Sequence, residues 1–311
     1  MPMPGDLRRA LLERLIDDAG LFPPARLAMP DALRDHAANR IGPLSWVQGR
    51  FIVPASQLGA VLAAWPEGLP AVRLSVVADT AGQADGGGFA AALDADLAAA
   101  AALERADSRV RVELVEVRVP EPDLAGEVPS AVRRAAFAGP VAAFAEAPDS
   151  TDAGALRAAV AAVTDARAAG ATRLGAKVRC GGVEASMIPA PEAVAAFLAA
   201  CVAGEVPFKA TAGLHHPVRG IDPASGMRMH GFVNLLVATA LLRAGALDDA
   251  ERIIGEEEAS AFSVAAEALG WRELTVDVAA VAAVRETSFT AYGSCSFDEP
   301  TGDLAALGWL P

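Results

Sequence analysis

The chain has 311 residues, is 53% hydrophobic and carries a formal net charge of −13 at pH 7. Its length allows one large domain or two ordinary ones, and its composition allows a sizeable core. The acidity argues against nucleic acid and against anionic membrane surfaces as partners, because both are bound through clustered Lys and Arg.

Apolar, β-rich runs alternate with Ala- and Leu-rich helical periodicity after an N-terminal amphipathic helix. The first predicted strand, residues 13–19, could equally finish that helix. The later predicted strands are residues 46–53, 72–78, 109–119, 141–145, 174–179 and 208–212, and the eighth is either 261–265 or 289–292. The predicted helices include residues 30–39, 128–137, 153–169, 191–203 and 232–244. A Gly-rich loop at 80–88 is expected to lead to an alanine helix ending near residue 106, and Ser150 or Thr151 to cap the helix at 153–169.

Eight strand–helix units without a linker predict one domain over residues 1–311, a TIM-type (β/α)8 barrel with an N-terminal helix and a C-terminal extension. The alternative is an open doubly wound sheet. That fold would need a Gly-rich fingerprint after the first strand, and the sequence that follows Asp17 and Asp18 is not one.

The sequence opens without an apolar signal region, and Asp, Glu and Arg interrupt its Ala-rich runs. We therefore expect a cytoplasmic protein. The three cysteines, Cys180, Cys201 and Cys295, have no paired spacing, which argues against a disulfide framework and against a CxxC metal site.

Lysine use is the most informative feature of the sequence. Lys177 and Lys209 are its only lysines among 26 basic residues, and both lie in apolar segments predicted as strands six and seven. A buried lysine amine can lose its proton and act as a nucleophile, whereas a guanidinium cannot. If neighbouring strands bring the two ammonium groups together, each should lower the pKa of the other, and one amine should form an imine with a carbonyl compound.

Catalytic groups of a (β/α)8 barrel lie at the carboxyl ends of its strands. Glu146 and His215 lie there as candidates for moving protons. Arg179 shares a strand face with Lys177, as Thr211 does with Lys209, because side chains alternate along a strand. Both are candidate substrate-binding residues, and Arg179 is expected to bind the anionic group of the substrate. The wider set of candidate site residues consists of Asp17, Asp18, Cys180, Ser294 and Asp298, while Glu116 and Arg118 end the fourth strand without an assigned role.

The loop from residue 215 to residue 230 is dense in polar groups and leads into a helix. Its His216, His230, Arg219 and Arg228 are candidate substrate-binding residues, and we expect them to hold an anionic group together with the free N–H groups of the helix start. The alternative is that these arginines are surface charges on a long loop.

The same histidines, His215, His216 and His230, together with Glu146, allow a divalent metal as an alternative cofactor. Adjacent histidines rarely bind one ion together, and the sequence has no HxH or HExxH spacing, so we expect no metal. His36 lies outside this group, in a predicted helix, and is expected to be structural.

The segment Phe208-Lys209-Ala-Thr-Ala-Gly213 resembles the strand-seven Lys-Thr-Ser-Thr-Gly segment of deoxyribose-phosphate aldolases and related class I aldolases. Lys177, one strand earlier, has the position of that family's Schiff-base lysine. The resemblance implies that Lys177 forms the imine and that Lys209 lowers its pKa. It covers only this part of the chain, and Ala210 and Ala212 stand where the family has hydroxyl residues.

The sequence therefore predicts a lyase of class I aldolase type that acts on a small anionic carbonyl compound without a cofactor. Homo-oligomerisation is left open. Two alternatives remain: a metal-dependent lyase or hydrolase, and a barrel that binds a ligand without chemistry.

Overall fold

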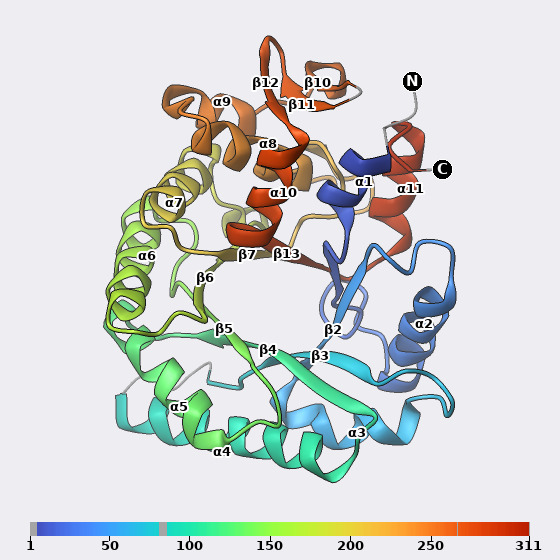
Figure 1. The fold of residues 1–311 in the computed structure, drawn as a ribbon, viewed down its shortest axis with the longest axis vertical. Coiled ribbons are helices and arrows are strands. Elements are labelled where there is room, and N and C mark those ends of the chain that lie inside the picture. Colours follow the sequence, from blue (N-terminus) through green and yellow to red (C-terminus); the bar gives the residue numbers. More distant parts are fainter. Residues whose placement is uncertain (1–4, 81–85, 266, 311) are drawn as a thin grey trace.

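Eight parallel strands close into a barrel in the spatial order β1-β13-β7-β6-β5-β4-β3-β2 (Figure 1). The computed structural model describes residues 5–80, 86–265 and 267–310. The barrel strands are β1 (Ile16–Asp18), β2 (Gln48–Pro54), β3 (Val72–Val77), β4 (Val110–Arg118), β5 (Ala142–Glu146), β6 (Leu174–Arg179), β7 (Phe208–Thr211) and β13 (Phe289–Ser294). Because neighbouring strands are parallel and helices separate them in sequence, the predicted TIM-type (β/α)8 barrel is confirmed.

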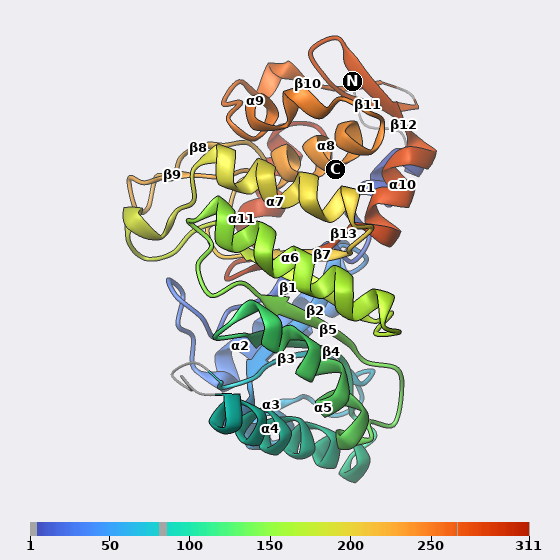
Figure 2. The ribbon, with the colours of Figure 1, turned by 90° about the vertical axis from the view of Figure 1, so that its left-hand side faces the viewer.

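Helices cover the outside of the barrel (Figure 2). They are α1 (Gly5–Leu12), α2 (Met29–Ile41), α3 (Leu58–Ala64), α4 (Gly86–Ala106), α5 (Glu127–Ala135), α6 (Ala153–Ala168), α7 (Pro191–Ala203), α8 (Phe232–Arg243), α9 (Ala250–Ile254), α10 (Val278–Thr287) and α11 (Asp298–Ala306). The helix α1 and the segment containing α11 are the predicted N-terminal helix and C-terminal extension. Two small antiparallel sheets lie outside the barrel: β8 (Gly220–Ile221) with β9 (Arg228–Met229), and β10 (Phe262–Val264) with β11 (Ala268–Trp271) and β12 (Leu274–Asp277).

Apolar spacing explains how the helices dock on the barrel. In α4, Phe89, Leu93 and Leu97 recur every fourth residue and are fully buried, which places them on one helix face. By length and composition alone, the segments Gly86–Ala106 and Ala185–Ala203 could cross a membrane. The apolar helices of a soluble core pass the same test, and both segments belong to the helical layer around the strands.

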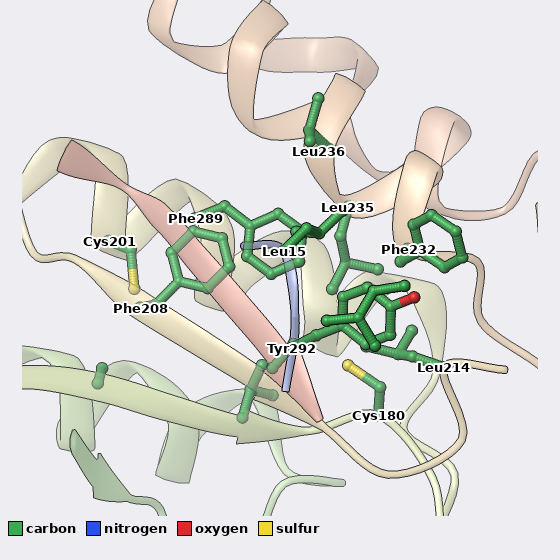
Figure 3. Packing of buried hydrophobic residues seen from close by; sticks show 14 of the residues in the cluster. Leu15, Cys180, Cys201, Phe208, Leu214, Phe232, Leu235, Leu236, Phe289 and Tyr292 are labelled. Atoms are coloured by element: carbon green, nitrogen blue, oxygen red, sulfur yellow. The ribbon is translucent and has the colours of Figure 1, made fainter. Parts of the chain in front are cut away.

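An aromatic layer fills the space between strands β7 and β13 and the helices outside them (Figure 3). The rings of Phe208 and Phe289 stack with centroids 5.1 Å apart, and those of Phe232 and Tyr292 stack at 4.8 Å. Because strand side chains alternate, an outward Phe208 directs its neighbour Lys209 into the barrel.

Several predicted boundaries were wrong. The first strand begins only at Ile16, because Arg14 has a left-handed φ of 51°, which interrupts extended backbone. The eighth barrel strand is the later of the two alternatives, β13, while Phe262–Val264 pairs with β11 in a separate sheet. Asp152, rather than Ser150 or Thr151, caps α6 by accepting the Gly154 N–H at 2.6 Å. The glycines at 86–88 are helical, and residues 81–85 of the predicted loop lie outside the described residues.

Candidate active site

Lys177 and Lys209 lie side by side in the barrel wall. They are register partners on the adjacent parallel strands β6 and β7. Lys209 pairs with residues of β1 and β4, neither of which neighbours β7, so its side chain must cross the barrel interior. Both lysines are buried, with Lys177 5% and Lys209 0% exposed. The prediction that two neighbouring strands bring the lysines together is confirmed.

One carboxylate, that of Glu116, joins the two lysines. Lys177 Nζ lies 2.6 Å from Oε2 of Glu116 and 2.8 Å from Oε2 of Glu146. Lys209 Nζ donates to Oε1 of Glu116 at 2.6 Å and to Oδ2 of Asp17 at 2.5 Å. Because an unpaired buried ion is very costly, these charges can be buried only as an alternating chain of opposite signs.

Asp17 occupies space that a side chain at position 49 would fill. A Cβ atom at Gly49 would lie only 2.1 Å from Oδ1 of Asp17. The backbone N–H of Arg50 donates to that oxygen at 2.6 Å, and Arg50 Nη1 lies 3.6 Å from it. The register of β1 against β2 shifts at this point, which is the behaviour of a β-bulge. Gly49 and the bulge therefore allow Asp17 to turn towards Lys209.

A second irregularity positions Glu116. The register of β4 against β3 shifts after Leu74, so Glu113 has no partner residue on β3. A bulge of this kind interrupts strict alternation and re-aims the side chains that follow. Glu116, beyond the bulge, accepts the Ser75 hydroxyl at 2.6 Å as well as both lysines.

The carboxylates reverse the pKa shift expected for Lys177. Burial lowers the pKa of Lys177, but Glu116 and Glu146 outweigh burial and hold that pKa above its usual value. Burial raises the pKa of Glu116, but the two lysines outweigh it and hold that pKa well below its usual range. Asp17 behaves alike, because Lys209 and Arg50 lower its pKa more than burial raises it. The prediction of a lysine with a depressed pKa is thus wrong for Lys177 in the resting protein.

Arg179 and Thr211 lie at the carboxyl ends of β6 and β7, two residues beyond the lysines, and are register partners. Both are partly exposed. The Arg179 backbone N–H donates to Ser150 Oγ at 3.2 Å. Within residues 5–80, 86–265 and 267–310, the guanidinium of Arg179 has no hydrogen bond or ion pair, so this cation is available to a ligand above Lys177.

His215 and His216 take different partners at the carboxyl end of the barrel. His215 Nδ1 lies 3.1 Å from Oε2 of Glu299 and 3.9 Å from Sγ of Cys295. Burial raises the pKa of Cys295, which favours the thiol over the thiolate. His216 lies between Asp303, at 2.6 Å, and the loop residue Asp222, at 3.2 Å. This histidine fastens the loop to α11, and the two carboxylates raise its pKa despite the opposing effect of burial.

The loop from 215 to 230 does not offer the anion site that its composition predicts. Arg219 and Arg228 both pair with Glu257. The first amides of α8 are also occupied, since the N–H groups of Phe232 and Val233 donate to backbone carbonyl oxygens of the preceding loop. Two of the N–H groups at the helix start are therefore not available to an anion.

His230 is structural as well. It is 1% exposed, and its Nε2 is 2.8 Å from the carbonyl oxygen of Pro189. Burial lowers the pKa of His230 to about 4, so the ring is neutral near pH 7.

Other candidates are divided between the site's edge and the core. Asp18, at the end of β1, pairs with His36 at 3.1 Å, and His36 has the expected structural role. Ser294 is buried at the end of β13, and Asp298 begins α11. Cys180 lies beside Tyr292 in the aromatic layer outside the barrel, and burial raises its pKa to about 12 (Figure 3). This cysteine is therefore not a site residue.

The residues proposed for a divalent metal do not converge. Glu146 pairs with Lys177 inside the barrel, whereas His230 contacts Pro189 and the other two histidines pair with separate acids. In the part of the chain that the structure describes, no group of three or more His, Cys, Asp or Glu side chains is arranged to hold a metal ion.

Glu116 and Ser75 are the site residues that sequence reasoning missed. Glu116 was noted at a strand end but received no role, although a carboxylate within the apolar sequence Leu-Val-Glu-Val is a signal of a buried ion pair. Ser75 gave no comparable signal, because serine is common in strands that face water.

The fold and this interior define a (β/α)8 barrel with a buried ionic network that reaches the carboxyl ends of its strands. The chain matches no protein-family model and no curated protein. The chemistry of the site itself therefore carries the functional argument.

Proposed function

We propose that the protein is a lyase of class I aldolase type, which makes or breaks a C–C bond in a small anionic carbonyl compound through an imine on Lys177. The observation that carries the proposal is the pair of buried lysines joined by Glu116. A fold that needs only fixed positive charge can use arginine, as this chain does elsewhere. Amines inside the barrel supply what arginine lacks, a group that can lose a proton and attack carbon.

Lys177 is better placed than Lys209 to form the imine. Its side chain is 6% exposed, and its partner Glu146 is the last residue of β5. The side chain of Lys209 is 0% exposed and is held between Asp17 and Glu116. We assign Lys209 a positioning role, in which it fixes Glu116 and adds positive charge beneath Lys177.

The resting ion pairs define the first proton transfer. Lys177 must pass a proton to Glu146 or Glu116 before its neutral amine adds to the substrate carbonyl. The carbinolamine then takes that proton and loses water to give the iminium. In the cleavage direction, the β-hydroxyl gives its proton to a carboxylate as the Cα–Cβ bond breaks, and the electron pair moves to the iminium to form an enamine. Protonation of the enamine at carbon and hydrolysis restore Lys177.

Arg179 supports the choice of an anionic substrate. Its guanidinium, without a protein partner in the described ranges, stands two residues beyond Lys177 on the same face of β6. A carboxylate or phosphate bound there would keep its carbonyl group within the barrel mouth.

Borohydride trapping tests the proposal. The protein is incubated with pyruvate or dihydroxyacetone phosphate and sodium borohydride, and the modified peptide is identified by mass spectrometry. We expect a reduced adduct on Lys177, lost in Lys177→Arg, which retains charge but not nucleophilicity. Arg179→Gln should require about tenfold more pyruvate for the same trapping, while trapping with neutral acetone stays unchanged. An adduct on Lys209 that persists in Lys177→Arg would overturn the assignment, and no adduct with any compound would overturn the imine mechanism.

A further inference from the structure

A group of arginines lies at the end of the barrel opposite the candidate active site. Arg14 precedes β1, Arg50 and Arg73 lie in the first halves of β2 and β3, and Arg40 lies in the last turn of α2. We call these four residues the floor arginines. Because α2 runs back to the start of β2, its last turn belongs to the same end of the barrel as the amino ends of the strands.

Glu113 is the carboxylate that these arginines share. It pairs with Arg14 and lies 3.1 Å from Arg50 Nε. In the described ranges, the only other ion pair of the floor arginines joins Arg50 to Asp17, which already neutralises Lys209. The floor arginines and Glu113 therefore bring an excess of positive charge together in a chain whose formal net charge is −13.

The floor arginines retain unused hydrogen-bond donors. Arg73 donates to the carbonyl oxygens of Gln48 and Gly49, but its Nε and that of Arg14 are buried without a hydrogen-bond partner in the described part of the chain. The side chain of Arg40 has no hydrogen bond or ion pair within these ranges. Unmet donors beside like charges are costly to bury, unless a ligand completes the arrangement.

The electrostatics agree with this geometry. Burial, together with the neighbouring Arg14, Arg40 and Arg50, lowers the pKa of Arg73 to about 10 against the opposing effect of Glu113. Burial and Arg14 likewise lower the pKa of Arg40. The charges of Arg73 and Arg40 are therefore destabilised by neighbouring guanidinium groups, and a bound anion would relieve this.

We propose that the floor arginines bind a small multivalent oxyanion of the phosphate class at the amino-terminal end of the barrel. Guanidinium groups match phosphate oxygens with paired, charge-assisted hydrogen bonds. The four side chains are partly rather than fully buried, so a ligand can reach them from solvent. The acidity of the whole chain disfavours long polyanions and favours a small ligand.

Titration calorimetry and thermal unfolding of the full chain test this site. Inorganic phosphate and pyrophosphate are compared with chloride at equal ionic strength. We expect saturable binding and a raised Tm with the two oxyanions only. Arg40→Gln should weaken pyrophosphate binding at least about tenfold, and in chloride its Tm should equal or exceed that of the original protein, because a repelling charge has gone.

Arg34→Gln is the matched control, since Arg34 lies on the same helix, is exposed and pairs with Asp31. It should bind pyrophosphate like the unchanged protein. Arg179→Gln removes a cation at the opposite end of the barrel. This variant should keep the Arg40-dependent binding, which distinguishes oxyanion binding by the floor arginines from binding at the candidate active site. Absence of saturable binding, or equal binding by the Arg40 and Arg34 variants, would show that the floor arginines hold no oxyanion.

Discussion

Glu116 determines the electrostatics of the barrel interior, because both lysines pair with its carboxylate. Glu116→Gln would preserve the size of the side chain and remove the shared negative charge. We expect the free energy of unfolding to fall by about 3–5 kcal/mol, as for other broken buried ion pairs. Urea unfolding measures the change.

Glu13→Gln provides the control for this variant. Glu13 pairs with Arg9 at 3.2 Å on the exposed surface of the protein. Its loss should change the free energy of unfolding by less than about 0.5 kcal/mol. If the two variants were equally stable, the lysines would have other counter-ions than the structure indicates.

The sequence reveals some of these residues and hides others. The rarity of lysine singles out Lys177 and Lys209 without a structure, and strand alternation places Lys177 and Arg179 on one face of β6. The expected lowering of the pKa fails for Lys177, because that expectation left out the carboxylate of Glu116 between the two lysines. An ionic network is a property of all its members, so one omitted carboxylate reverses the predicted shift.

At the scale of single elements, the geometry of β2 depends on Gly49, which has no side chain. Oδ1 of Asp17 fills the space beside Gly49, where a Cβ atom would lie 2.1 Å away. Gly49→Ala should therefore displace Asp17 from Lys209 and lower the free energy of unfolding by about 1–3 kcal/mol. Chemical denaturation, with crystallography of the variant, measures both effects.

Gly59→Ala is the comparison for this substitution. Gly59 lies in α3, is exposed, and a Cβ atom there would meet nothing within 4 Å. Alanine should be neutral or stabilising by up to about 1 kcal/mol, because glycine is a poor helix former. A Gly49→Ala protein as stable as the Gly59 variant would contradict the packing described for Asp17.

Bulges and loop contacts mark the limit of prediction at the element scale. Strict alternation of side chains would place Glu113 and Glu116, three residues apart, on opposite faces of β4. The β4 bulge shifts this pattern, so that Glu113 pairs with arginines at the amino end of the barrel and Glu116 pairs with the two lysines. The loop from 215 to 230 misleads for a related reason. Its composition suggests an anion site. In the structure, however, the first two N–H groups of α8 donate to loop carbonyl oxygens, and both arginines of the loop pair with Glu257.

For the whole molecule, the order of strands and helices was predictable because the apolar runs and helical periodicity repeat along the chain. That repetition also suits an open doubly wound sheet, and the missing Gly-rich fingerprint after the first strand favoured the closed barrel that the structure shows. The limits of the shortest barrel strand, β1, and of the extra sheet of β10, β11 and β12 were not predictable, because short apolar runs have too few residues to show a period.

Plotted against pH, the free energy of unfolding should show a broad plateau. Asp17 and Glu116 set its acid limit, and Lys177 sets its basic limit. Asp17 and Glu116 have depressed folded pKa values, so their contribution is complete above their unfolded values near pH 4 and falls as pH decreases through the folded values. Lys177 has a raised folded pKa, so its contribution is complete below its unfolded value near pH 10 and falls as pH increases through the folded value.

Urea unfolding at successive pH values measures this profile. Glu116→Gln should lower the plateau and flatten its acid limb, because one of the network's two carboxyl groups with a lowered pKa is gone. A variant whose acid limb matches that of the unchanged protein would place the acid sensitivity elsewhere in the chain.

The burial of both lysines has a consequence for chemical labelling. The outer surface displays guanidinium groups but no lysine amine. Acylating reagents used to attach fluorophores, cross-linkers or solid supports will therefore find no lysine on the outside of the folded barrel. Lys177 can be reached only through the barrel mouth, and the side chain of Lys209 is 0% exposed. The rate at which Lys209 is acylated therefore reports how often the interior around it opens.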